Sequence, residues 1–170
     1  MTTSKVEPWL RGTLMELDPL RRGVVHALWL ASEDVTRWSE SLSDAEMEMR
    51  PFGLPSVGFQ MRHIVRSLDR LLTYADGSQL SAEQLAALKS ELESSGLQVD
   101  LFAEFDRGIE SAIARVRAIA QESYGEARGV GRAGLPSSVG GLLVHCAEHT
   151  QRHVGQLVTT TKVVMAMRER

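Results

Sequence analysis

The sequence of 170 residues has one cysteine, few lysines and no long apolar run. With Cys146 alone, neither an internal disulfide nor a thiolate metal cluster can form. The net charge of -3 argues against a protein that grips a nucleic-acid backbone. No stretch has the apolar length of a membrane span, and Met1 to Pro8 lack the apolar core of a signal peptide. We therefore expect a soluble cytoplasmic protein without nucleic-acid or membrane partners.

Sustained alternation of period two is also missing, so the sequence predicts essentially no sheet. Apolar residues instead recur at three- and four-residue steps, which is typical of amphipathic helices. Asp18 is a candidate N-cap with Pro19 at the first helical position, and Ser56 is the candidate cap of a second helix that stops near Gly77. The apolar stripes of three long segments are Leu20, Val24, Leu28, Ala31, Val35 and Trp38; Val57, Met61, Ile64, Val65, Leu68, Leu72 and Ala75; and Leu101, Phe105, Ile109, Ile113, Val116 and Ile119.

Two more helices complete the predicted set. Ser81 and Gln84 form a capping-box pattern that opens a shorter helix, which runs out near Ser94-Ser95-Gly96. The last helix begins near Val139 and extends to about Met165. We therefore predict an all-α fold, a four-helix bundle with an additional short helix, as one domain over residues 1–170 with its core at about 10–165 and flexible N-terminal residues.

A short pattern occurs twice. Leu54-Pro55-Ser56-Val57-Gly58 precedes His63, and Leu135-Pro136-Ser137-Ser138-Val139-Gly140 precedes His145, each histidine six residues after the valine. The repeat indicates either two similar helix starts or an approximate internal two-fold symmetry of the bundle.

The last helix carries three histidines at four-residue intervals, His145, His149 and His153. Each step of four turns the side chain by only about 40°, so all three share one face. His149 and His153 point inward with the apolar stripe, and His145 lies on its edge. Metal ligation would satisfy such inward imidazoles in their neutral form. The alternative is core histidines hydrogen-bonded to each other, to backbone or to water.

A third ligand must come from another segment. His26 falls opposite the apolar stripe of its helix, near Arg22 and Glu33, and we interpret it as a surface histidine. His63 lies on a flank of its helix, so periodicity does not select it, and a partly exposed helix histidine remains an alternative.

The segments Pro55 to Gly77 and His145 to Gln156 resemble the second and last helices of the DinB/YfiT-like superfamily, and the similarity extends over roughly Leu10 to Val164. The resemblance implies an up-down-down-up bundle in which His63, His149 and His153 bind one divalent metal ion. One departure is that Val154 follows the final histidine, where the family often has arginine; here Arg152 precedes that histidine. We also expect a homodimer.

Three histidines leave at least one coordination position open for water or substrate. Zinc, nickel and iron all accept imidazole, so the metal is not specified. An ion there could lower the pKa of bound water or activate an external low-molecular-weight thiol. The resemblance therefore implies a metal-dependent enzyme for a small molecule, either a thiol-dependent S-transferase or a hydrolase. The alternative is a dimeric, stress-related interaction protein that binds metal without turnover.

Several other residues are weaker candidates. Gln156, one turn beyond His153, and His145 could support the site. Arg132, in the Gly- and Arg-rich loop 125–138, could meet an anionic substrate at the pocket mouth. Residues 129–134 match the dinucleotide-binding fingerprint in letters, but no strand is expected before them. Cys146 is interpreted as a core residue, and Glu148 points away from the inward histidines.

Overall fold

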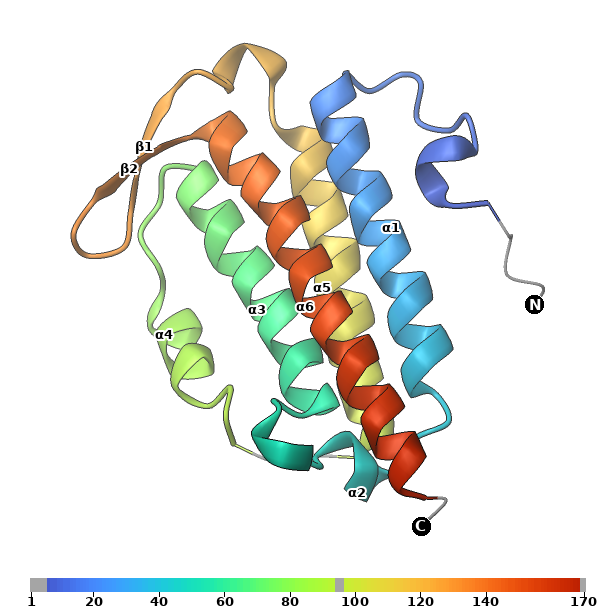
Figure 1. The fold of residues 1–170 in the computed structure, drawn as a ribbon. Helices are drawn as coiled ribbons and strands as arrows, with labels where there is room; N and C mark the ends of the chain where they lie inside the picture. Colours follow the sequence, from blue (N-terminus) through green and yellow to red (C-terminus); the bar gives the residue numbers. More distant parts are fainter. Residues whose placement is uncertain (1–5, 94–96, 169–170) are drawn as a thin grey trace.

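Four long helices form the body of the computed structural model, which describes residues 6–93 and 97–168 (Figure 1). They are α1 (Pro19–Ser39), α3 (Val57–Ala75), α5 (Gln98–Ala118) and α6 (Val139–Met167). Both α1 and α3 pack against α5 and α6. In Figure 1, α1 and α6 run in one direction and α3 and α5 run in the other. The predicted all-α fold is confirmed.

The helix ends follow the local signals of the sequence. The Asp18 carboxylate accepts hydrogen bonds from the backbone N–H groups of Leu20 and Arg21 at the start of α1. Ser56 and Ser138 cap α3 and α6 in the same way. At the end of α3, Gly77 adopts a φ of 80°, a left-handed conformation that glycine adopts without strain. Since Ser56 and Ser138 each cap a helix, the repeated sequence pattern corresponds to two similar helix starts.

Because α3 and α5 run in the same direction, the chain between them must return along the bundle. The short helix α4 (Ala82–Lys89) lies on this crossover, and the predicted capping box of Ser81 and Gln84 is present. It ends at Lys89, earlier than predicted; the expected end near Ser94-Ser95-Gly96 lies outside the described residues. No residue of α4 is buried. The connection between α1 and α3 includes α2 (Asp44–Met47) and a short 3-10 turn, Pro51–Gly53.

The expectation of essentially no sheet needs one correction. Strands β1 (Ala127–Val130) and β2 (Leu135–Ser138) pair in antiparallel register as a hairpin before α6. Neither strand has an apolar face, so period-two patterning could not reveal them. The fingerprint-like residues 129–134 include the last two residues of β1 and the hairpin turn, where Gly131 and Gly134 have φ values of 69° and 58°.

The core consists of apolar side chains from all four long helices, including Leu28, Ile64, Leu68, Phe105, Val116, Leu143 and Leu157. Within residues 6–93 and 97–168, no helix combines the length and apolar character that crossing a membrane requires.

Candidate metal centre

The antiparallel neighbours α3 and α6 bring three histidines together. His63 lies in the second turn of α3, and His149 and His153 lie one turn apart on α6. One nitrogen of each imidazole lies within 4.8 Å of the corresponding nitrogen of the other two. The Nε2 atoms of His63 and His149 are 3.1 Å apart. The ring centroid of His153 is 4.3 Å from that of His63 and 4.4 Å from that of His149.

The environment favours neutral imidazoles. Burial, reinforced by repulsion from the neighbouring histidines, lowers the pKa of His149 from 6.5 to about 4. Burial and the charges of His63 and Arg152 lower the pKa of His153 to about 4 as well. The imidazole rings of His149 and His153 are therefore neutral at neutral pH, as the rings of metal-binding histidines must be.

Hydrogen bonds on the outer side of two rings orient their inner nitrogens. Nδ1 of His63 lies 2.7 Å from Oε2 of Glu91, and Nδ1 of His153 lies 2.7 Å from Oε1 of Gln60. Both oxygens are acceptors, so each Nδ1 carries the proton and each Nε2 presents a lone pair to the centre. Phe59 stacks on the His63 ring at a centroid distance of 5.3 Å.

The donor set fits one divalent ion. Two nitrogens bound to a common ion at about 2.0–2.1 Å lie roughly 3 Å apart, which matches the 3.1 Å between the Nε2 atoms of His63 and His149. Without an ion, the same contact is a hydrogen bond, in which Nε2–H of His149 donates to Nε2 of His63. His63, His149 and His153 could therefore hold a metal ion, and three ligands leave a position open for water or substrate.

The weaker candidates lie at different distances from this group. His145 contacts His149 at a ring-centroid distance of 5.2 Å, but its Nδ1 lies 2.7 Å from a Glu148 oxygen, and both side chains are about half exposed. Gln156 accepts a hydrogen bond from Gln60, and its own side chain also bonds to His153, which partly opposes the lowering of the pKa of that histidine. Arg132 lines a separate hollow at the hairpin, with none of the three histidines among its lining residues.

The sequence predicted a surface position for His26 and a core position for Cys146. His26, expected at the surface, is only 6% exposed, because the segment before α1 covers it and Thr13 lies within hydrogen-bonding distance of its Nε2. The surface interpretation is therefore wrong. Cys146 is buried as expected, and burial raises the pKa of its thiol to about 12, so it remains protonated.

The sequence analysis missed two supporting residues. Gln60 is fully buried and lies on the apolar stripe of α3, three residues after Val57, so a polar residue in that stripe was an available signal. Glu91 follows α4 and is 4% exposed. Burial opposes its ionisation, but hydrogen bonds from His63 and Arg70 outweigh burial and lower its pKa. No local pattern connects Glu91 to a histidine 28 residues earlier.

The fold and the histidine group define an all-α bundle with a candidate metal centre. The chain matches the model of the DinB superfamily over residues 28–157 and belongs to that superfamily. It is similar in structure to a conserved protein from Enterococcus faecalis, with a TM-score of 0.71 and 17% identity over 84% of this chain and 95% of the other. A protein from Streptococcus pneumoniae gives a TM-score of 0.59 and 13% identity over 84% and 88%. No curated protein matches.

Proposed function

We propose that this protein is a metal-dependent enzyme that transfers a low-molecular-weight thiol to a small electrophilic molecule. The observation that carries the proposal is the convergence of His63, His149 and His153. When bound, a divalent ion such as zinc, nickel or iron would lower the pKa of a thiol at an open position. In the overall reaction the S–H bond and the bond from the electrophilic carbon to its leaving group break, a bond from sulfur to that carbon forms, and the leaving group takes both electrons of its bond and the proton.

The surroundings favour a thiol transferase over a hydrolase. A hydrolase needs a proton acceptor beside the attacking water. Glu91 is engaged by His63 and Arg70 on the outer side of the His63 ring, and Glu148 is exposed beside His145. Neither carboxylate is placed to accept a proton at the inner Nε2 atoms. A thiol needs no such base once its pKa is lowered.

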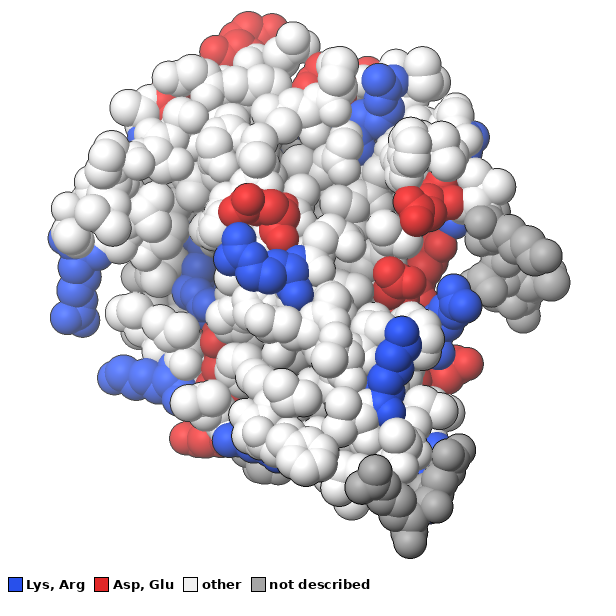
Figure 2. All heavy atoms as spheres, viewed as in Figure 1, with Lys and Arg blue, Asp and Glu red and all other residues white. Residues whose placement is uncertain are grey.

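The chain's own residues would position the reactants. His149 and His153 present neutral nitrogens, and Glu91 and Gln60 fix the orientation of the His63 and His153 rings. Acidic and basic side chains are interspersed on the face shown in Figure 2, which supports a small-molecule substrate over a nucleic acid. A homodimer and a cytoplasmic location belong to the same proposal.

The test combines elemental analysis with a thiol-consumption assay. Native protein should carry about one divalent ion per chain. It should consume thiol in the presence of a panel of electrophiles, and both chelation and His149→Ala should stop consumption. Hydrolysis of the panel without thiol consumption would support the hydrolase. Stoichiometric metal with neither activity would favour the alternative, a metal-binding interaction protein without turnover.

A further inference from the structure

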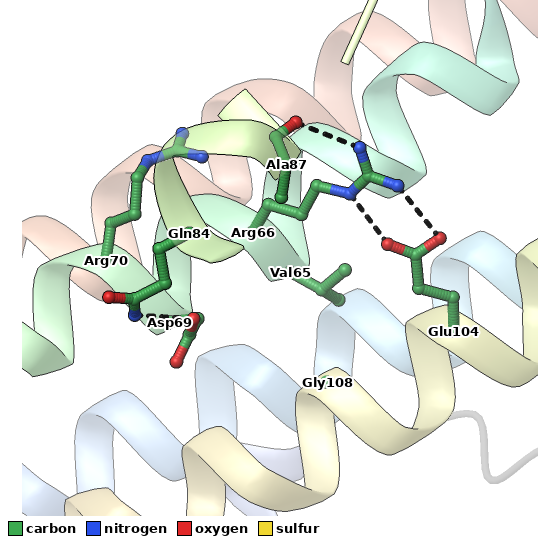
Figure 3. Close-up of a pocket in the computed structure, with 8 residues that line it drawn as sticks. All are labelled: Val65, Arg66, Asp69, Arg70, Gln84, Ala87, Glu104 and Gly108. Atoms are coloured by element: carbon green, nitrogen blue, oxygen red, sulfur yellow. Dashed lines mark hydrogen bonds and ion pairs between the residues drawn. The ribbon is translucent and has the colours of Figure 1, made fainter. Parts of the chain in front are cut away.

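Helix α4 is attached to the bundle mainly by hydrogen bonds. Leu85 and Leu88 are 37% and 44% exposed, and Leu92, one turn beyond, is 65% exposed. Gln84 and Ala87 are among the residues that line the space between α4 and α3 (Figure 3). An amphipathic helix usually buries its apolar side, whereas α4 has no buried residue and leaves its leucines exposed.

Side chains of α3 hold each end of α4. At the start, Nε2 of Gln84 donates to Oδ2 of Asp69 at 2.6 Å and to Oγ1 of Thr73 at 2.8 Å. Near the end, Nη1 of Arg66 donates to the carbonyl of Ala87 at 3.1 Å, as Figure 3 shows. The same guanidinium also pairs with Glu104 of α5.

An open cleft of 180 Å³ lies between α4 and the bundle. Val65 and Gly108 line it on the side of the bundle, and Gln84 and Ala87 line it on the side of α4 (Figure 3). It is large enough for several water molecules. Water can therefore replace the hydrogen bonds that hold α4, at a much smaller cost than exposing a packed helix.

Glu91 joins this weakly attached segment to the candidate metal centre. It lies two residues after α4 and accepts hydrogen bonds from Nδ1 of His63 at 2.7 Å and from Nη1 of Arg70 at 2.5 Å. Arg70 also donates to Ser67, which fixes the guanidinium. Because Glu91 follows α4 so closely, it reaches His63 only while α4 is in place.

We propose that Glu91 is a positioning residue for His63, and that metal binding and the docking of α4 therefore stabilise each other. The inference rests on the proposed metal centre. A carboxylate on Nδ1 keeps Nε2 directed at the ion and raises its basicity. By linkage, an ion that binds more tightly to the docked form must strengthen docking by the same factor.

The first test measures zinc affinity by competition with a chromophoric chelator. Glu91→Ala should weaken binding by about 10- to 100-fold. Glu91→Gln should recover much of this loss, because an amide oxygen can still accept from Nδ1 of His63. Glu93→Gln is the matched control, since Glu93 is exposed two residues further on, and it should bind like the wild type. Wild-type affinity in Glu91→Ala would overturn the proposal.

The second test acts on α4 far from the ion. Thr73 lies ten residues beyond His63 on α3, about 15 Å along the helix, so Gln84 cannot touch the centre. Gln84→Ala should still weaken zinc binding, by about threefold, by loosening α4. In a Glu91→Ala background it should have no further effect. Independent, additive effects of the two substitutions would overturn the link between docking and metal.

Hydrogen exchange gives a readout that does not depend on activity. Zinc should slow exchange of the amides of residues 82–91 in the wild type, and should not do so in His63→Ala or Glu91→Ala. If the wild type binds zinc but these amides exchange at an unchanged rate, this inference fails and the metal centre stands. If the wild type binds no zinc, the proposed function fails and the inference fails with it.

Discussion

Two regions that differ in how they are packed support the candidate metal centre: helix α6, and the segment of α4 and Glu91. On α6, His149 and His153 share a helix whose Leu143 and Leu157 are fully buried, and the fully buried Gln60 supports His153. His63 instead depends on Glu91, which follows α4, a helix without a buried residue. Apolar packing therefore fixes both helices that carry the histidines, α3 and α6, whereas the carboxylate that orients the His63 ring is held by polar contacts that water can replace.

The largest expected effect is on metal content. His149→Ala and His153→Ala should each reduce bound metal from about one ion per chain to a small fraction of that, because two remaining ligands hold an ion poorly. Elemental analysis of the purified variants measures this. His145→Ala, on the same helix, is the control and should keep its metal. Equal metal content in all three variants would mean that the ion binds elsewhere.

Substitutions on α6 and on α4 should also differ in their effect on the free energy of unfolding. Leu157→Ala, which empties a fully buried position on α6, should lower the free energy of unfolding by about 2–5 kcal/mol. Leu88→Ala, the same change at a 44% exposed position on α4, should change it by less than about 0.5 kcal/mol. Urea unfolding of metal-free protein gives both values. Comparable losses would show that α4 is packed as firmly as α6.

In the metal-free protein, the free energy of unfolding should depend on pH through His149 and His153, the two inward histidines of α6. The pKa values of His149 and His153 fall from 6.5 to about 4 on folding, so the unfolded chain binds more protons between these limits. The free energy of unfolding should therefore rise with pH from about 4 to 6.5 and level off above that window. Urea unfolding at about pH 5 and pH 7.5 measures the rise. A variant lacking both histidines should show a smaller rise; an identical rise would assign it to other groups.

The smallest effect concerns Gln156, which contacts both Gln60 and His153. Gln156→Ala should weaken zinc binding by no more than about threefold, because Gln60 keeps its bond to Nδ1 of His153. Gln60→Ala should cost about 10- to 100-fold. Chelator competition measures both, and the reverse order would mean that Gln156 contacts the reactants directly.

The sequence predicted what depends on local signals. Helix periodicity and the caps Asp18, Ser56 and Ser81 depend on neighbouring residues, and the structure has all three. The capping box of Ser43 and Glu46, which opens α2, carried the same signal and was missed. His63 could not be selected by periodicity, and only the resemblance to the DinB superfamily singled it out.

Features that depend on tertiary contacts could not be predicted in this way. His26 is buried because the chain before α1 folds back over it, and a helical wheel contains no such information. Glu91 meets His63 because the crossover returns along α3 and carries the carboxylate to it. The strands of the hairpin pair without an apolar face, so their sequence resembles that of a loop.

The buried thiol of Cys146 can be used to measure how often the helix bundle opens. Its thiol lies on α6 one turn before His149 and is fully buried, with a pKa of about 12, so a thiol-modifying reagent cannot react with it in the closed bundle. Cys146 is the one cysteine of the sequence, so thiol labelling measures this position alone. The rate of labelling therefore measures how often the bundle opens around the histidines, and a bound ion should slow that rate by the factor by which it lowers the population of the open form.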